Sequence, residues 1–206
     1  MFRYLIELIK KYHNKNILRA HKKFLLLNCV VGKNFCKSPA YKDTEMQLLN
    51  VKIVNKTGDK NKIRFGSYCN VTVNIFLNEK GSITVGDYVY MNSVHMRIDH
   101  NLKIGSHYLF GPNIKLWDTK NHPLSSSERH RQCEYIAHHG FVDSYQAGGG
   151  DINIGDDVWI GMDSIILGGV TIGNGSVIAS GSIVTKSIPE NVLAAGVPAK
   201  VIRMID

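Results

Sequence analysis

The sequence predicts an all-β protein whose main domain is a parallel β-helix of six-residue repeats. From position 154 onward an aliphatic residue returns at every sixth position, and the residue four positions after each is small or β-branched. The aliphatic positions are Ile154, Ile160, Ile166, Ile172, Ile178 and Val184. A period of six fits neither the 3.6-residue turn of a helix nor the alternation of a half-buried strand. It fits coils in which each repeat supplies one short strand and one corner.

Composition and charge indicate a globular chain with a basic end. The 206 residues suffice for one sizeable domain and an appendage, and 44% hydrophobic against 20% charged residues argues against disorder. Residues 1–28 supply six of the eight net positive charges, with seven lysines and arginines against one glutamate. The nearly neutral remainder argues against a general nucleic-acid-binding surface. The four scattered cysteines form no CxxC pair and are typical of reduced thiols in a cytosolic protein.

Residues 1–48 are predicted to form an N-terminal helical appendage. The apolar residues Phe2, Leu5, Ile6 and Ile9 lie at helical spacing. Charged residues interrupt the apolar runs, which argues against a signal peptide and a transmembrane helix. Two interpretations stay open: helices packed on the body or on a neighbouring subunit, and a basic arm lying on an anionic membrane. The expected location is the cytoplasm, with peripheral contact at the inner membrane face in the second case.

Residues 49–206 are predicted to form the β-helix domain. The six-residue rhythm is loose at first, becomes regular, and gives way to residues 187–206, which we expect to cap the solenoid. Thirteen positions, one more than two repeats, separate Met91 from Ile104. We therefore expect one bulged residue near 99–101.

A long interruption divides the repeats at residues 118–151. It is polar, contains four histidines, and has three consecutive glycines before Asp151. Long non-repetitive loops in compact domains are usually functional, and insertions in a solenoid often project from the binding face. We therefore predict an active-site loop here.

His122 is the candidate catalytic residue of this loop. It precedes Pro123, which stiffens the chain at the root of the loop. The unperturbed imidazole pKa of about 6.5 allows a histidine to accept a proton near neutral pH, as a general base must. The spacing alone leaves a surface histidine without a role as the alternative.

His95 and His100 form an H-x4-H pair that suggests a second kind of site. With His122 as a third ligand, they would resemble the zinc site of the gamma-class carbonic anhydrases, which use the same helical architecture. The C-terminal segment points elsewhere, because Lys186, Lys200 and Arg203 stand beside Gly- and Pro-shaped turns. Such a cluster suits the binding of phosphate groups, and no metal is expected.

Several motifs of the chain resemble those of the hexapeptide-repeat acetyltransferases, over about residues 60–206. The motifs are NIKL at 113–116, NHPL at 121–124, DVWIG at 157–161, and the segment 184–203 that ends in AGVPAKVIR. The branch resembled contains the galactoside and maltose O-acetyltransferases and enzymes that acetylate surface polysaccharides. The resemblance implies a left-handed β-helix, acetyl-CoA as co-substrate, and a homotrimer with active sites between subunits. It implies a sugar or polysaccharide acceptor and no nucleic acid.

The resemblance also assigns roles to single residues. His122 would deprotonate an acceptor hydroxyl that attacks the thioester directly, without an acyl-enzyme. Asn92 and Asp99 fall near acceptor-binding positions, and Trp159 would wall the acetyl and acceptor region. The implied cofactor-binding residues are Trp159, Gly161, Ser180, Thr185, Lys186, Lys200 and Arg203.

Three positions depart from the pattern of the family. Ser180 replaces an alanine whose backbone contacts the cofactor, and Lys200 replaces an arginine, which keeps the charge but loses the bidentate fork. Met162 replaces a small residue, so we expect a differently shaped channel. The loop after His122 is longer than in the sugar acetyltransferases, and we interpret it as the element that selects the acceptor.

The leading hypothesis is therefore an acetyl-CoA-dependent O-acetyltransferase acting on a carbohydrate hydroxyl, with a surface polysaccharide or oligosaccharide unit as acceptor. N-acetylation of an amino sugar and O-acetylation of a xenobiotic or antibiotic are the alternatives within enzymes. A non-catalytic β-helix scaffold and a gamma-class carbonic anhydrase are the remote alternatives.

Overall fold

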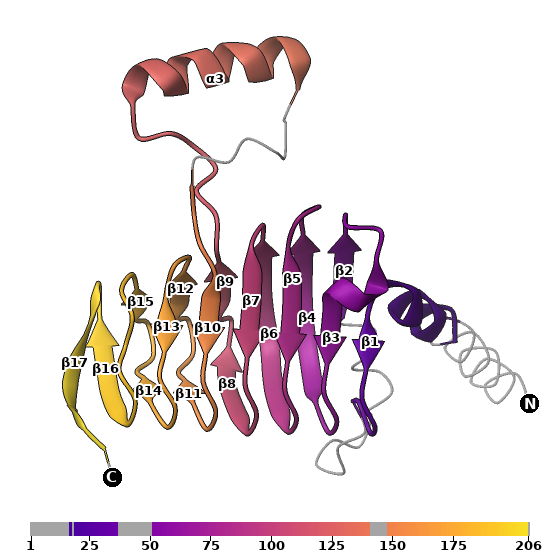
Figure 1. The fold of residues 1–206 in the computed structure, drawn as a ribbon, viewed down its shortest axis with the longest axis vertical. Helices are drawn as coiled ribbons and strands as arrows, with labels where there is room; N and C mark the ends of the chain where they lie inside the picture. Colours follow the sequence, from indigo (N-terminus) through magenta and orange to yellow (C-terminus); the bar gives the residue numbers. More distant parts are fainter. Residues whose placement is uncertain (1–16, 18, 37–50, 141–147, 206) are drawn as a thin grey trace, which may run out of the picture.

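The computed structural model describes residues 17, 19–36, 51–140 and 148–205. Figure 1 shows a stack of parallel coils from which one long loop projects, as the repeat pattern predicts. The chain therefore adopts the parallel β-helix expected from the six-residue period.

One side of the stack is a six-stranded parallel sheet. Its strands, in spatial order, are β1 (Val30–Val31), β3 (Ile63–Phe65), β5 (Ser82–Val85), β7 (Asn101–Ile104), β10 (Ile152–Ile154) and β13 (Thr171–Ile172). The 3-10 helix η2 (Lys60–Lys62) leads into β3. The register places Ile154 beside both Ile104 and Ile172, so equivalent repeat positions stack on one another.

The other two sides form one bent eleven-stranded sheet. The second side contains β8 (Tyr108–Pro112), β11 (Trp159–Ile160), β14 (Val177–Ile178) and β16 (Val192–Gly196), with β17 (Ala199–Met204) antiparallel at its end. The third side contains β2 (Lys52–Asn55), β9 (Lys115–Trp117), β12 (Ile165–Leu167) and β15 (Ile183–Val184). The long strands β4 (Asn70–Leu77) and β6 (Val89–Ile98) join them, because β6 pairs first with β8 and then with β9.

The repeat residues build the core. The six aliphatic positions from Ile154 to Val184 are at most 2% exposed. Ser164, Ser176 and Ser182 are also buried, and each hydroxyl donates a hydrogen bond to a backbone carbonyl. A buried hydroxyl needs such a partner, so the hydrogen bonds of these three serines offset the cost of burying them in the core.

The coil irregularity inferred from the spacing of Met91 and Ile104 has two parts. Residues 99 and 100 form a bend between β6 and β7. A register shift also occurs earlier in β6, between Tyr90 and Asn92. Both features lie close to the predicted acceptor-binding positions.

The described part of the N-terminal segment packs on the first coil. Residues 19–28 are helical, Leu25 and Cys29 are buried, and β1 pairs with β3. The predicted helix over residues 2–9 lies outside the described residues. Within the described chain, no helix is long and apolar enough to cross a membrane.

Candidate functional site

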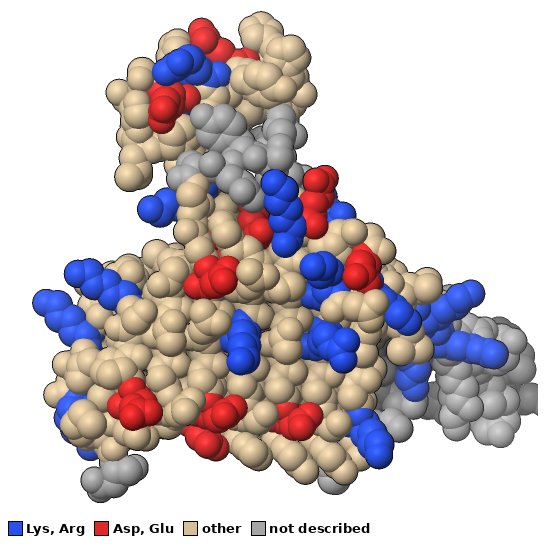
Figure 2. All heavy atoms as spheres, viewed as in Figure 1, with Lys and Arg blue, Asp and Glu red and all other residues tan. Residues whose placement is uncertain are grey.

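The inserted loop leaves the stack at the corner between the third and first sides, after β9 and before β10. Two backbone hydrogen bonds join its two ends, from Lys120 N to Gly148 O (2.8 Å) and from Gly150 N to Asp118 O (3.0 Å). Together they form the antiparallel bridge between Thr119 and Gly149. Figure 2 shows the loop rising as a narrow stalk from the stack, with a row of acidic side chains along the opposite edge. The loop is therefore held at its root and projects away from the coils.

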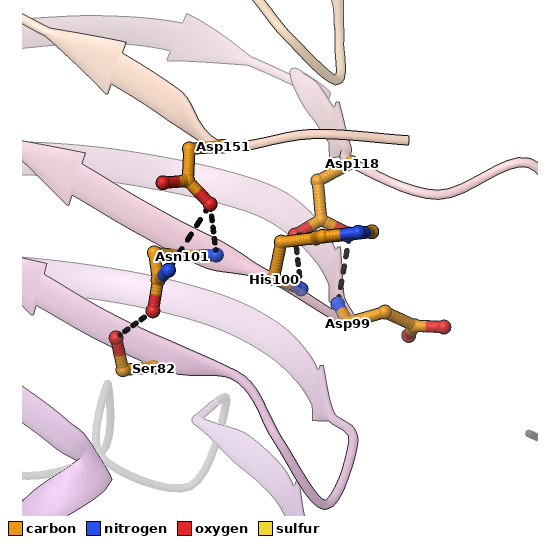
Figure 3. A network of polar contacts seen from close by, with 6 residues as sticks. All are labelled: Ser82, Asp99, His100, Asn101, Asp118 and Asp151. Atoms are coloured by element: carbon orange, nitrogen blue, oxygen red, sulfur yellow. Dashed lines mark hydrogen bonds and ion pairs between the residues drawn. The ribbon is translucent and has the colours of Figure 1, made fainter. Parts of the chain in front are cut away.

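Asp118 is a buried carboxylate at this root (Figure 3). Its oxygens accept the backbone N–H groups of Asp99, at 2.8 Å, and of His100, at 2.7 Å. The His100 ring lies beside the same carboxylate, with Nδ1 at 3.8 Å from Oδ2. Burial raises the pKa of Asp118, while the two backbone N–H groups and the charge of His100 oppose that shift.

Asp99, a predicted acceptor-binding residue, lies at the same root. Its side chain points away from Asp118 in Figure 3 and is 3% exposed. Its Oδ1 atom is buried without a hydrogen-bond partner among the described residues. On the outer side of the root, Asp151 Oδ1 accepts from the backbone and side chain of Asn101, whose Oδ1 accepts from Ser82.

His122 lies on the loop with its side chain exposed. Its Nδ1 atom is 3.0 Å from Oε1 of Gln132, and Gln132 Nε2 donates to the carbonyl of Asn121 at 3.0 Å. Arg129 Nη1 donates to the carbonyl of Pro123 at 3.0 Å and also to that of Leu124. Two side chains therefore hold residues 121–124 in place.

Both side chains come from α3 (Ser126–His139), a helix that the sequence reading did not identify. Its signals were Ser125 before the helix, Glu128 in the first turn and Gly140 after the last turn. The helical pattern is hard to recognise in the sequence because α3 has no apolar stripe that would mark a packed face. Gln132 is the single buried residue of the helix. The remaining loop histidines, His130, His138 and His139, are exposed.

A second group of predicted residues lies at the corner between the second and third sides. An added Cβ at Gly161 would come 2.5 Å from the backbone nitrogen of Ser180, so adjacent coils approach closely there. Asn92 lies on the same column of corners, opposite Pro112, and its Oδ1 accepts from Thr72 at 3.3 Å. Met162 is half exposed directly after Gly161.

Trp159 belongs to a row of side chains that crosses the second side. It pairs with Leu109 and Val177, and the row continues through Leu193 to Arg203. The Trp159 side chain is 54% exposed. Lys200 is exposed opposite Ala195 on the last strand pair. Trp159, Lys200 and Arg203 are thus presented on one outer surface.

Thr185 and Lys186 lie at a different corner from Ser180. They follow β15, are exposed, and share the corner of the loop root, where an added Cβ at Gly168 would come 2.3 Å from Asp118 O. The third side, with β9, β12 and β15, separates the two corners. One chain therefore does not bring all the predicted residues together. The corner of the loop root holds Asp99, His122, Thr185 and Lys186. The remaining predicted residues lie at the corner between the second and third sides or on the second side, namely Asn92, Trp159, Gly161, Ser180, Lys200 and Arg203.

The three histidines of the zinc alternative have separate neighbours. The Nδ1 atom of His95 is 3.4 Å from Asn74 Nδ2, while His100 lies beside Asp118 and His122 contacts Gln132. In the described part of the chain, no three His, Cys, Asp or Glu side chains are grouped to hold a metal ion.

Comparisons with known proteins identify relatives of this arrangement. The bacterial transferase hexapeptide model (six repeats) matches residues 151–186. A galactoside O-acetyltransferase of Lactococcus lactis is 35% identical over 68% of this chain, and a putative acetyltransferase of Saccharomyces cerevisiae is 34% identical over 82%. The chain spans 62% of the length of the first relative and 74% of the second.

A solved structure supports the same family. A galactoside acetyltransferase in complex with coenzyme A is 30% identical, with a TM-score of 0.56. The match covers 91% of this chain and 80% of that one. The repeat model, the relatives and this fold agree with the left-handed parallel β-helix that the sequence resemblance implies. The chain belongs to the hexapeptide-repeat acetyltransferases, in the branch of the galactoside O-acetyltransferases.

Proposed function

We propose that the protein is an acetyl-CoA-dependent O-acetyltransferase that acetylates a hydroxyl of a carbohydrate, with a surface polysaccharide or oligosaccharide unit as acceptor. The observation that carries this proposal is the exposed His122, held by two hydrogen-bonding side chains at the root of the projecting loop. The likeness to a galactoside acetyltransferase in complex with coenzyme A supports the choice of donor. The long polar loop beside His122 supports a large acceptor.

The reaction follows from the properties of imidazole. His122 accepts the proton of the acceptor hydroxyl as its oxygen attacks the thioester carbonyl, and a C–O bond forms. Collapse of the tetrahedral intermediate breaks the C–S bond, and coenzyme A leaves as the thiol after receiving the proton. A backbone N–H that faces the oxyanion would contribute about 3 kcal/mol. No nucleophilic serine or cysteine is needed.

The cofactor surface consists of Trp159, the corner of Gly161 and Ser180, and three cations. Lys200 and Arg203 are exposed on the last strand, on the same outer surface as Trp159, and they would attract the phosphate groups of coenzyme A. Thr185 and Lys186 would contact the adenosine end from a neighbouring copy, because they lie at the other edge of the third side.

A homotrimer with active sites between subunits would unite these two edges. The outer faces of the sheets differ in a way that supports self-association. The outward row of the first side is polar and comprises Arg64, Thr84, Lys103, Asn153 and Thr171. The outward row of the second side is apolar and comprises Tyr90, Leu109, Trp159, Val177 and Leu193. Exposed apolar surface of this kind favours burial against another subunit.

A His122→Ala variant tests the activity. Acetyl-CoA and a panel of oligosaccharides are supplied, and release of the coenzyme A thiol is measured. We expect the rate to fall about 100-fold to 10,000-fold, the usual contribution of a general base. His130→Ala is the matched control, because His130 is an exposed histidine of α3 that pairs with Glu134. An unchanged rate in His122→Ala would overturn the proposed mechanism.

The chemistry of the product distinguishes O-acetylation from N-acetylation. Mild hydroxylamine cleaves an acetyl ester and leaves an acetamide intact. We expect acetyl release from the product, and an amide product would overturn the assignment to a hydroxyl. The cytoplasmic location and the membrane contact of the basic arm stay predictions, since residues 1–16 lie outside the described chain.

A further inference from the structure

Gln132 is buried although it lies on a helix with no apolar face. It is 6% exposed, although the rest of α3 is polar and largely open to solvent. A buried amide requires partners for both its oxygen and its nitrogen. Gln132 finds them in two consecutive residues of the loop root, the carbonyl of Asn121 and the ring of His122.

These two contacts determine the orientation of the amide. The carbonyl of Asn121 can only accept a hydrogen bond, so the atom 3.0 Å from it is the NH2 group of Gln132. The amide oxygen must then face His122, at 3.0 Å from Nδ1. Because that oxygen can only accept, Nδ1 must carry the hydrogen. The neutral ring therefore has its lone pair on Nε2.

We propose that Gln132 is a positioning residue that holds neutral His122 in the Nδ1–H tautomer, so that Nε2 is the atom that accepts the substrate proton. This inference rests on the proposed role of His122 as general base. When Nε2 takes up the proton, Nδ1 still carries its hydrogen, and the bond to Gln132 persists. The proton transfer therefore requires no rearrangement of this contact, and catalysis depends on which ring nitrogen is free.

The same helix face also fixes the backbone next to the ring. Arg129 is three residues before Gln132, so the two side chains project from one face of α3. Arg129 binds the carbonyls of Pro123 and Leu124, which follow His122 directly. Of the residues of α3, Gln132 and Arg129 thus orient the ring and its backbone.

The first test compares Gln132→Met, Gln132→Glu and Cys133→Ala in the full-length protein. Methionine preserves length and volume without the amide, and we expect kcat to fall about 10-fold to 100-fold, which is less than the 100-fold to 10,000-fold contribution of the general base itself. The acetyl-CoA KM should not change. Glutamate keeps an acceptor for Nδ1–H and should recover part of kcat. Cys133→Ala alters the exposed neighbour on α3 and should match the wild type.

A double variant separates positioning from general damage. If Gln132 acts through His122, Gln132→Met lowers the rate of the wild type but not the rate of His122→Ala. An equal loss in both backgrounds would contradict the proposal. So would an unchanged kcat in Gln132→Met. If His122→Ala itself keeps full activity, the proposed role of His122 as general base is wrong, and the tautomer is then decided by spectroscopy alone.

The spectroscopic test is nitrogen-15 NMR of histidine-labelled protein. The His122 signals are identified by their loss in His122→Ala. For the neutral ring, we expect the wild type to show a protonated Nδ1 and an unprotonated Nε2. Gln132→Met should shift the population toward the Nε2–H form, whereas Gln132→Glu should keep Nδ1–H. A wild-type spectrum of the Nε2–H form, or no change in Gln132→Met, would overturn the assignment whatever the activity.

Discussion

The carboxylate of Asp118 accepts the backbone N–H of His100 at 2.7 Å, although the two residues are eighteen positions apart. The same carboxylate accepts the N–H of Asp99, so it ties the end of β9 to the bend that follows β6. The inserted loop starts immediately after this contact. Its root is therefore anchored by a buried side chain in addition to the two backbone hydrogen bonds that close it.

Asp118→Asn should lower the free energy of unfolding by about 1–3 kcal/mol, because an amide offers one acceptor where two backbone N–H groups need partners. Urea unfolding followed by circular dichroism measures the loss. Asp151→Asn is the matched control: Asp151 also accepts at the root, but it is exposed, and its loss should stay below about 1 kcal/mol. Equal losses of unfolding free energy in the two variants would show that the burial of Asp118 adds nothing to stability.

The pH dependence of stability should carry the sign of the shifted Asp118 pKa. Burial raises this pKa above its ordinary value of 3.8, so the folded state binds the proton more tightly than the unfolded state. Protonated Asp118 therefore contributes to the stability of the folded state. This contribution is fully present below pH 3.8 and is lost as the pH rises through the higher folded-state pKa. Hence the difference in Tm between wild type and Asp118→Asn should shrink as pH increases from about 4. A difference that grows with pH would contradict the raised pKa.

Gly168→Ala should destabilise the protein more than Gly169→Ala. A Cβ at Gly168 would come 2.3 Å from the carbonyl oxygen of Asp118, so the backbone must move. Gly169 has open space around a Cβ, but its φ of 81° is positive, which costs about 1–2 kcal/mol for alanine. Thermal unfolding of the two variants tests the order. The reverse order would show that the coil at Gly168 relaxes easily.

Arg203→Ala should raise the acetyl-CoA KM about tenfold, which corresponds to about 1.4 kcal/mol of binding. The reason is the loss of a charged donor that the proposed cofactor surface would offer to a phosphate group of coenzyme A. Steady-state kinetics at saturating acceptor provide the measurement. Lys103→Ala removes a cation from the outer face of the first side and should leave KM unchanged. A similar rise in both variants would indicate a general effect of net charge.

Leu109→Asp should weaken the proposed trimer. Leu109 is 59% exposed in the apolar row of the second side, and a carboxylate buried at a subunit contact is costly. Sedimentation velocity should show a smaller species than the wild type. Thr84→Asp places the same charge in the polar row of the first side and should not change the assembly. A wild-type monomer, or a Leu109→Asp trimer, would refute this arrangement.

The repeat sequence by itself determined the coils. Each aliphatic residue and its small partner are local neighbours, and their burial depends only on the next coil repeating the same pattern. Ile154 to Val184 therefore predicted the parallel β-helix. Residue type and motif also suggested chemical roles for His122 and the cations of the C-terminal segment, and these roles stay predictions.

The tertiary structure alone decided how those residues are grouped. α3 has no apolar stripe, so no periodicity reveals the helix or its contact between Gln132 and His122. The split of the predicted site between two corners depends on the register of β12 with β15. Single hydrogen bonds and long-range registers leave no repeating pattern in a sequence. The coils could be predicted from the sequence because the pattern of buried residues repeats, whereas the orientation of the His122 ring depends on one contact that does not repeat.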